Sequence, residues 1–143
     1  MALYALSQRT TATAAASASW EVRSTSGNKP KVIVVELTQN AATAGVYGVG
    51  TPAAIGVTPT SPQTFLDEAD GNGATGLTTA AVAWGTGPTV PANFKRRYSC
   101  AATIGVGFIY LPPGGLGIAV SSSFVIWIIA TAPVCDVSAS VQE

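Results

Sequence analysis

The longest unbroken apolar run in the chain extends from Phe124 to Ala130, and it constrains the fold more than any other segment. The run is rich in β-branched and aromatic residues and is apolar at both alternating sets of positions. A strand that is covered on both faces shows this pattern, because its successive side chains point to opposite faces. A buried helix is the alternative, but Ser121–Ser123 and Pro133 leave too few residues for three helical turns. We therefore predict a central strand at residues 124–130, which the rest of the chain covers.

Most of the remaining chain consists of short segments with strand character, separated by turn residues. Trp20–Ser24 alternates apolar and polar residues, as a half-buried strand does. Lys31–Gln39 is predicted to be a second strong strand, with Ile33, Val35 and Leu37 on one face and its charged residues on a wet or interfacial face. In total there are about eight to ten such segments, with turn chemistry between them and no convincing helix. We therefore predict an all-β fold, a single antiparallel β-sandwich of the jelly-roll or immunoglobulin-like type.

The length of 143 residues indicates one domain, with an N-terminal arm or edge strand at residues 1–19 and the β-sandwich at residues 20–143. Within the first segment, Leu3 and Leu6 surround Tyr4, which is enough for a short strand or for an arm that packs on a neighbour. The following tract of Ala, Thr and Ser is ambiguous, because Ala favours helix while Thr and Ser favour strands and turns. Leu3, Tyr4, Leu6 and Arg9 are candidate partner contacts on this arm.

The charge composition predicts that the protein associates with others. Only 10% of the residues are charged, against a usual value of about 25%, and the seven basic and seven acidic residues cancel. Such a surface depends on Ser, Thr, Asn and Gly for its solubility and tends to associate. We therefore expect much of the exterior to be buried against further copies or another protein.

Targeting segments and cysteines add little to this interpretation. No secretory signal is visible, and no apolar run approaches the ~20 residues of a membrane span, so we expect a soluble protein with no membrane partner. Cys100 and Cys135 are too few for a disulfide framework. We expect both to be free, buried thiols, with a single bridge between them as the alternative.

The sequence argues against catalysis. It contains no His, which removes the commonest general base and metal ligand and every Ser-His or Cys-His nucleophile. The acidic cluster of Asp67, Glu68 and Asp70 lies in one Gly-rich loop, not across a cleft, and lacks the ligand order of a calcium loop. The glycines of residues 45–50 have GxxGxG spacing, which is not the dinucleotide fingerprint. We predict a non-enzymatic protein with no metal and no cofactor.

Two sets of side chains are candidates for binding. Lys95, Arg96 and Arg97 form the sole basic concentration, and on a strand Arg96 would share a face with Phe94 and Tyr98. Three basic residues on a neutral chain are too narrow a field for direct contact with nucleic acid. Ion pairs with a partner protein, or with the acidic loop of a neighbouring copy, are favoured.

Aromatic side chains supply the second set. Tyr47, Trp84 and Tyr110 could form a platform on which sugar rings stack, whereas core packing accounts better for Trp20 and Trp127. A carbohydrate-binding module is therefore an alternative function.

Several segments together resemble the small virion proteins of tailed bacteriophages, of the β-sandwich head decoration, or cement, type. They are the strand that opens Trp20-Glu21-Val22, the β-rich run that ends Glu36-Leu37, a Gly-Pro loop, and the segments 102–107, 112–116 and 124–127. The likeness is scattered over residues 18–137. It implies a jelly-roll or immunoglobulin-like sandwich, often trimeric, that sits on the capsid lattice and clamps neighbouring coat subunits.

We therefore predict a virion structural protein that binds the outside of a phage capsid and stabilises it by bridging coat subunits. Its expected partners are the major capsid protein and further copies of itself, with a trimer favoured. It is expected on the capsid surface, after synthesis in the cytoplasm of the host bacterium. The arm at residues 1–19 is expected to extend onto a neighbour, so that its removal leaves the domain folded. A tail- or fibre-associated host-recognition protein is the alternative in the same setting.

Overall fold

The computed structural model describes residues 2–25, 27–69 and 73–143, and it contains thirteen strands and no helix in these ranges. The strands are β1 (Leu3–Arg9), β2 (Ser17–Arg23), β3 (Lys31–Gln39), β4 (Gly45–Gly50), β5 (Val57–Pro59), β6 (Gln63–Asp67), β7 (Thr75–Ala81), β8 (Trp84–Thr86), β9 (Arg96–Cys100), β10 (Gly107–Tyr110), β11 (Leu116–Gly117), β12 (Ser123–Ala130) and β13 (Cys135–Gln142). The prediction of an all-β fold is confirmed. The strands outnumber the predicted segments because several of them contain only two or three residues.

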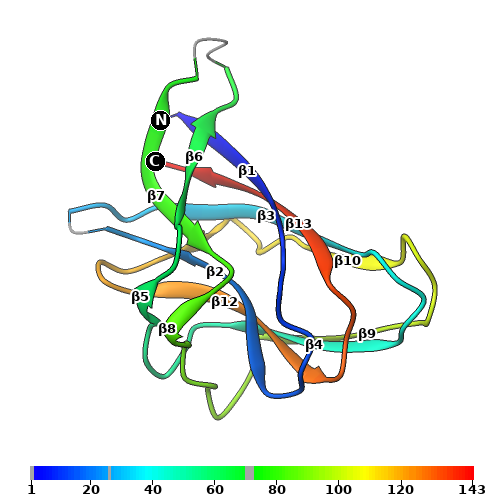
Figure 1. Ribbon diagram of the computed structural model, residues 1–143. Helices are drawn as coiled ribbons and strands as arrows, with labels where there is room; N and C mark the ends of the chain where they lie inside the picture. Colours follow the sequence, from blue (N-terminus) through cyan, green and yellow to red (C-terminus); the bar gives the residue numbers. More distant parts are fainter. Residues whose placement is uncertain (1, 26, 70–72) are drawn as a thin grey trace.

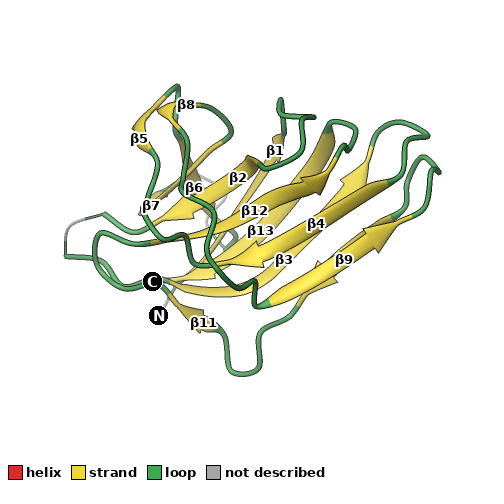
Figure 2. Ribbon diagram, turned by 90° about the horizontal axis from the view of Figure 1, so that it is seen from below, coloured by secondary structure: helices red, strands yellow, loops and turns green. Residues whose placement is uncertain are grey.

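One large antiparallel sheet forms the body of the molecule. Its order is β10-β3-β13-β1-β6-β7-β2-β12-β4-β9, and β11 also pairs with β3. The sheet folds back on itself until its two end strands, β9 and β10, meet, so that the antiparallel sandwich is a nearly closed barrel (Figures 1 and 2). At that meeting point the rings of Tyr98 and Phe108 stack with their centroids 4.0 Å apart. Every strand pair in the ring is joined by hydrogen bonds except this last one.

The predicted central strand, β12, lies between β2 and β4 and is covered on both faces. Phe124, Ile126 and Ile128 point into the main core of the barrel, and all three are fully buried. Val125 and Trp127 point to the outside, where Ala18, Trp84 and Phe94 pack against them. This two-sided burial explains why the segment has no polar face.

The outer cover of β12 is a small sheet made of β5 and β8, with a bridge between Ala54 and Thr89 beside it. The buried carboxylate of Glu21 holds this cover in place, because it accepts hydrogen bonds from Trp84 Nε1 at 2.6 Å and from the Gly56 amide at 3.3 Å. Glu21 also pairs with Arg23, whose Nη2 donates to the Gly56 carbonyl at 2.9 Å. The prediction that β2 is only half-buried is therefore wrong.

The first strand is an integral part of the sheet. β1 pairs with β13 along its whole length, from Leu3 opposite Gln142 to Arg9 opposite Asp136, and its other edge pairs with β6. Tyr4 and Leu6 pack against the core. The expectation of an arm that extends onto a neighbour is therefore wrong for residues 3–9. Because side chains alternate along a strand, Tyr4 and Leu6 point to the same face of β1. That face packs on the core when β1 lies between β13 and β6.

The face assignment for β3 is wrong at Val32 and Ile33, beyond a bulge near the start of the strand. The register against β13 shifts between Val34 opposite Ser140 and Val32 opposite Val141. A bulge of this kind moves the residues beyond it to the other face of the sheet. Val32 is consequently buried together with Val35, while Ile33 is only half-buried.

Both cysteines are free and buried, as predicted. The Cys135 Sγ lies 3.1 Å from the hydroxyl of Tyr47, which also accepts a hydrogen bond from Gln39 Nε2 at 3.1 Å. Burial raises the pKa of both thiols, so they are protonated at neutral pH.

The hairpin of β6 and β7 rises beyond the rest of the barrel, with both termini beside it (Figure 1). Glu143 fastens its base, because the side-chain carboxylate accepts hydrogen bonds from the amides of Thr78 at 2.6 Å and Leu77 at 2.9 Å. Burial alone would raise the pKa of Glu143, but hydrogen bonds from the Thr78 side chain and from these two amides outweigh it and hold the pKa below its ordinary value of 4.5.

This carboxylate makes the stability depend on pH. Because the pKa of Glu143 is lower in the folded state, its ionised carboxylate stabilises the fold at pH values above the ordinary pKa of 4.5. This stabilisation is lost as the pH falls below 4.5 and through the folded-state pKa. We expect Glu143→Gln to lower the unfolding free energy by about 1–3 kcal/mol at pH 7 and to have little effect near pH 3. Thermal unfolding of both chains across this pH range measures the difference, with Glu36→Gln, at an exposed position, as the control. An equal difference at both pH values would contradict this role.

Candidate interaction surface at the seam between β9 and β10

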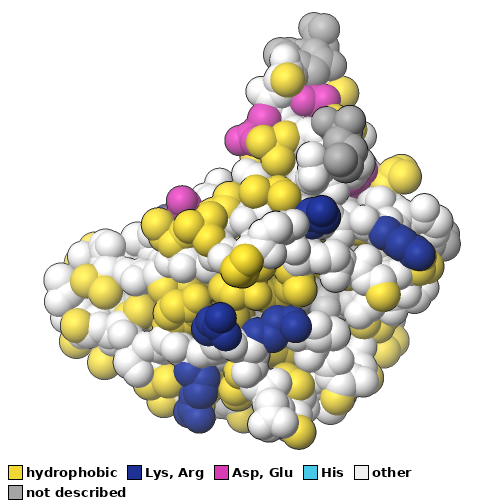
Figure 3. Space-filling model, turned by 180° about the vertical axis from the view of Figure 1, so that it is seen from behind, with side chains coloured by type: hydrophobic (Ala, Val, Ile, Leu, Met, Phe, Trp, Pro, Cys, Tyr) yellow, Lys and Arg dark blue, Asp and Glu magenta, His cyan; other side chains and the backbone are white. Residues whose placement is uncertain are grey.

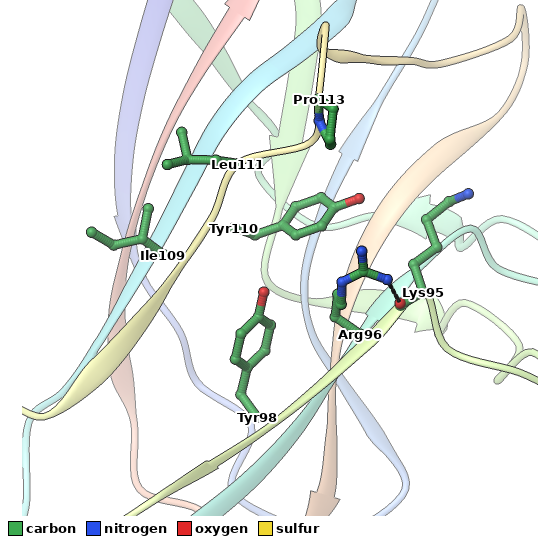
Figure 4. A pocket seen from close by; sticks show the side chains of 7 residues that line it. All are labelled: Lys95, Arg96, Tyr98, Ile109, Tyr110, Leu111 and Pro113. Carbon is green, nitrogen blue, oxygen red and sulfur yellow. Dashed lines mark hydrogen bonds between the residues drawn. The ribbon is translucent and has the colours of Figure 1, made fainter.

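The place where the barrel fails to close is the most distinctive surface of the molecule. In the described sheet β9 pairs with β4 alone and β10 pairs with β3 alone, so each has one free edge. Free strand edges present unpaired amide and carbonyl groups, and they pair readily with other chains. A hollow of about 440 Å³ lies between the two strands. Its lining residues are Lys95, Arg96, Tyr98, Ile109, Tyr110, Leu111 and Pro113 (Figure 4).

Local packing places the start of β9 at the mouth of this hollow. Phe94 packs on Trp127 with ring centroids 5.6 Å apart, on the outer face of the sheet. Gly48 allows this contact, because a Cβ atom there would lie 2.6 Å from the Phe94 ring. The amide of Lys95 then donates to the Val49 carbonyl at 2.8 Å and begins the pairing of β9. The prediction that Phe94 shares a face with Arg96 is wrong, because Phe94 precedes the strand and turns to the outer face.

Two tyrosines form the floor of the hollow. Tyr98 stacks on Phe108, and Tyr110 stacks on Phe124 with centroids 5.4 Å apart. Burial raises the pKa of both phenols, and the Arg96 guanidinium offsets part of this rise. Both hydroxyls therefore keep their protons at neutral pH and can donate and accept hydrogen bonds. Figure 4 shows the Tyr98, Tyr110 and Arg96 side chains gathered around the same hollow.

The three predicted basic residues lie at the seam and are exposed. Arg96 Nη1 donates to the Lys95 carbonyl at 2.8 Å, which holds the guanidinium beside the hollow. Within the described residues, no carboxylate lies within salt-bridge distance of Lys95, Arg96 or Arg97. The seam therefore carries positive charge that the described part of its own chain does not neutralise.

Large apolar side chains are exposed beside these cations. Ile109 is 56% exposed and Leu111 is 65% exposed, and both line the hollow. Tyr and Arg around exposed apolar side chains are the composition found at the centres of protein–protein interfaces. Ile109, Leu111 and Tyr98 were not predicted as contact residues. The available signal was the apolar run at residues 108–111, which ends in Pro112 and has no polar face.

The N-terminal candidates do not join this surface. Tyr4 and Leu6 pack against the core, and Leu3 is partly exposed on β1. Arg9 is paired with Asp136 on β13 at 2.9 Å, so its charge is satisfied within the chain. Two strands, β13 and β3, separate β1 from β10. The structure therefore keeps Leu3, Tyr4, Leu6 and Arg9 apart from the basic group at residues 95–97.

The three aromatic residues proposed as a sugar platform do not form one. Tyr47 is completely buried in the core, and Tyr110 is 8% exposed. Trp84 is half-buried and its Nε1 donates to Glu21. Stacking of a sugar ring requires an open aromatic face, so these residues do not support the carbohydrate-binding alternative.

One acidic residue, Glu36 on β3, lies opposite Ile109 of β10, and the described part of the acidic cluster predicted from the sequence lies on the hairpin that rises beyond the barrel. Asp67 and Glu68 are on the hairpin of β6 and β7, and residues 70–72 of the predicted acidic loop lie outside the described ranges. In Figure 3 acidic side chains gather along this hairpin, with another on the body, and basic side chains lie beside an apolar area on the lower body and also below the hairpin. Over the described residues, no set of three Asp, Glu or Cys side chains is placed to share a metal ion. The same residues contain no helix that is long and apolar enough to cross a membrane.

Comparisons of this chain with models of protein families, with curated proteins and with solved structures find no match.

Proposed function

We propose that this chain is a non-enzymatic structural protein of a phage virion, which binds the outside of the capsid lattice and stabilises it by bridging coat subunits. The setting comes from the sequence resemblance to head decoration proteins. The observation that carries the proposal is the seam, where exposed Ile109 and Leu111 lie beside Lys95 and Arg96 at two free strand edges. A bridging protein needs such a contact surface on a rigid body, and the barrel supplies one.

Burial of apolar area would provide most of the binding free energy. Each Å² of apolar surface removed from water contributes about 25 cal/mol, before the cost of association and of side-chain ordering is deducted. The cations at the seam would add orientation and a salt-dependent association rate more than affinity. Many copies bound at symmetry-related sites would together resist expansion of the shell.

Density-gradient centrifugation of particles from infected cells tests this function. We expect the chain to migrate with DNA-filled capsids and to be present at a constant ratio to the coat protein, measured by quantitative mass spectrometry. Recovery only with isolated tails would favour the host-recognition alternative. Recovery only as free protein would overturn the proposal.

The double substitution Ile109→Ser and Leu111→Ser should reduce the number of copies on particles. Loss of two buried apolar side chains weakens binding by about 2–3 kcal/mol, which corresponds to a roughly 30- to 150-fold lower affinity. Val57→Ser is the control, because Val57 is 57% exposed on β5, away from the seam. Both variants should unfold at nearly the wild-type temperature, since the substituted side chains are exposed. If the double variant were present on particles in the same number of copies as the wild type, the seam would not be the surface that binds them.

A further inference from the structure

Although the net charge is zero, the unpaired basic and acidic side chains of the described residues concentrate in different parts of the fold. Arg9 pairs with Asp136 and Arg23 pairs with Glu21, so these four charges are satisfied internally. The remaining basic residues include the group at residues 95–97 on the seam, with Lys29 and Lys31 as a separate pair near the start of β3. Described acidic residues outside these pairs include two adjacent carboxylates on the hairpin of β6 and β7 (Figure 3). Glu36 on β3 lies opposite Ile109, but the three cations at residues 95–97 outnumber it. The seam therefore keeps a net positive charge, whereas the described part of the hairpin is acidic.

The hairpin also presents apolar side chains of its own. Leu66 is 50% exposed on β6 and Leu77 is 63% exposed on β7. They accompany Asp67 and Glu68, just as Ile109 and Leu111 accompany the cations of the seam. Each surface thus combines exposed aliphatic groups with charge, and the signs are complementary.

The sheet order separates these two surfaces, because β1, β13 and β3 lie between β6 and β10. β6 and β7 are the fifth and sixth of the ten strands in the ring, whereas β9 and β10 are its two ends. The hairpin consequently cannot reach the seam of its own chain, but it projects from the body and is free to reach another (Figure 1).

We propose that the acidic hairpin of one copy docks into the basic seam of a second copy, in a head-to-tail contact. Leu66 and Leu77 would lie against Ile109 and Leu111, with Asp67 and Glu68 near the cations at residues 95–97. A contact between two different surfaces leaves one hairpin and one seam unused in a dimer, so it continues into a closed ring or an open chain. The inference rests on the proposed function for its setting on a capsid, and it names a second copy as the partner that occupies the seam. Ile109 and Leu111 would then support particle binding by holding neighbouring copies together.

Sedimentation velocity and light scattering on the purified chain test this contact. Wild-type protein at about 100 µM, which would be a hundredfold excess over a Kd of ~1 µM, should form oligomers that dissociate as salt is raised. A seam variant (Lys95→Ser, Arg96→Ser and Arg97→Ser) and a hairpin variant (Asp67→Asn and Glu68→Gln) should each be monomeric. The control variant Lys29→Ser and Lys31→Ser removes two cations that do not line the hollow, and it should assemble as the wild type does.

Mixing the two variants gives the sharpest result. Only one native contact can form in the mixture, between the intact seam of the hairpin variant and the intact hairpin of the seam variant. We therefore expect a one-to-one heterodimer that grows no further. A monomeric wild-type chain, oligomers that survive either set of substitutions, or a mixture that stays monomeric would each overturn the head-to-tail contact.

Failure of this contact is distinguishable from failure of the proposed function. A chain that binds particles but is monomeric in solution, with unchanged particle binding by the hairpin variant, would overturn the contact between copies and leave the capsid role intact. A chain that forms the heterodimer but never accompanies particles would overturn the capsid role and leave the contact intact.

Discussion

A chain that lacks residues 2–9 is expected not to fold. β1 occupies the place between β13 and β6, so its removal leaves two new unpaired edges in the middle of the sheet. The deletion also removes Tyr4 and Leu6 from the core and leaves Trp20 Nε1 without its acceptor, Gln8 Oε1, at 2.9 Å. Two apolar side chains contribute about 3–6 kcal/mol and the lost ladder contributes more, whereas a whole domain is stable by only about 5–15 kcal/mol.

Circular dichroism and thermal unfolding of the shortened chain measure this outcome. We expect no cooperative transition and a protein that aggregates through its open edges. The control is Leu3→Ser, which alters an exposed side chain of the same strand and should keep the fold. A shortened chain that unfolds cooperatively near the wild-type temperature would restore the interpretation of this segment as a dispensable arm.

Glu21→Ala should have the largest effect of any single substitution on the outer cover of the barrel. The change removes the partner of Arg23 and the acceptor for Trp84 Nε1 and the Gly56 amide. Loss of one partner from a buried ion pair costs about 3–5 kcal/mol, because the remaining charge is buried and uncompensated. Urea denaturation should therefore show a large drop in the unfolding free energy, together with greater proteolytic sensitivity at residues 51–62.

Two further variants separate the causes. Glu21→Ala combined with Arg23→Met should recover part of the lost stability, because no unpaired charge then remains in the buried site. Glu36→Ala, on the exposed face of β3, should change the unfolding free energy by less than about 0.5 kcal/mol. A loss below about 1 kcal/mol for Glu21→Ala would show that the small sheet stays in place without this carboxylate.

Charged side chains protect the free edge of β9 at the seam. An exposed edge strand can form hydrogen bonds with a strand of any other chain, and charged side chains on the edge oppose this pairing. Lys95, Arg96 and Arg97 provide such charges on β9, while Ile109 and Leu111 keep an apolar area on β10. Like charges on β9 therefore oppose direct pairing between the seams of two copies.

Local patterns in the sequence were sufficient to predict the type of fold. The apolar run at residues 124–130 predicted a strand covered on both faces, because a pleated strand directs its side chains alternately to either side. Alternation in Lys31–Gln39 and the turn residues between segments predicted an antiparallel all-β chain. The same patterns identified the basic group at residues 95–97, since clustered charge is visible without knowledge of the fold.

The tertiary structure alone decided which strands are neighbours, and with that which residues are exposed. Strand order depends on contacts between residues far apart in the chain, and the periodicity of apolar residues within one segment does not predict such contacts. This is why Glu21 is buried beneath a small sheet from residues 57–86, why β1 is enclosed by β13 and β6, and why Ile109 and Leu111 remain uncovered on an end strand. Alternating apolar residues indicate that a strand has one face toward the core. Only the closure of the barrel determines whether its opposite face is covered by other residues or exposed to solvent.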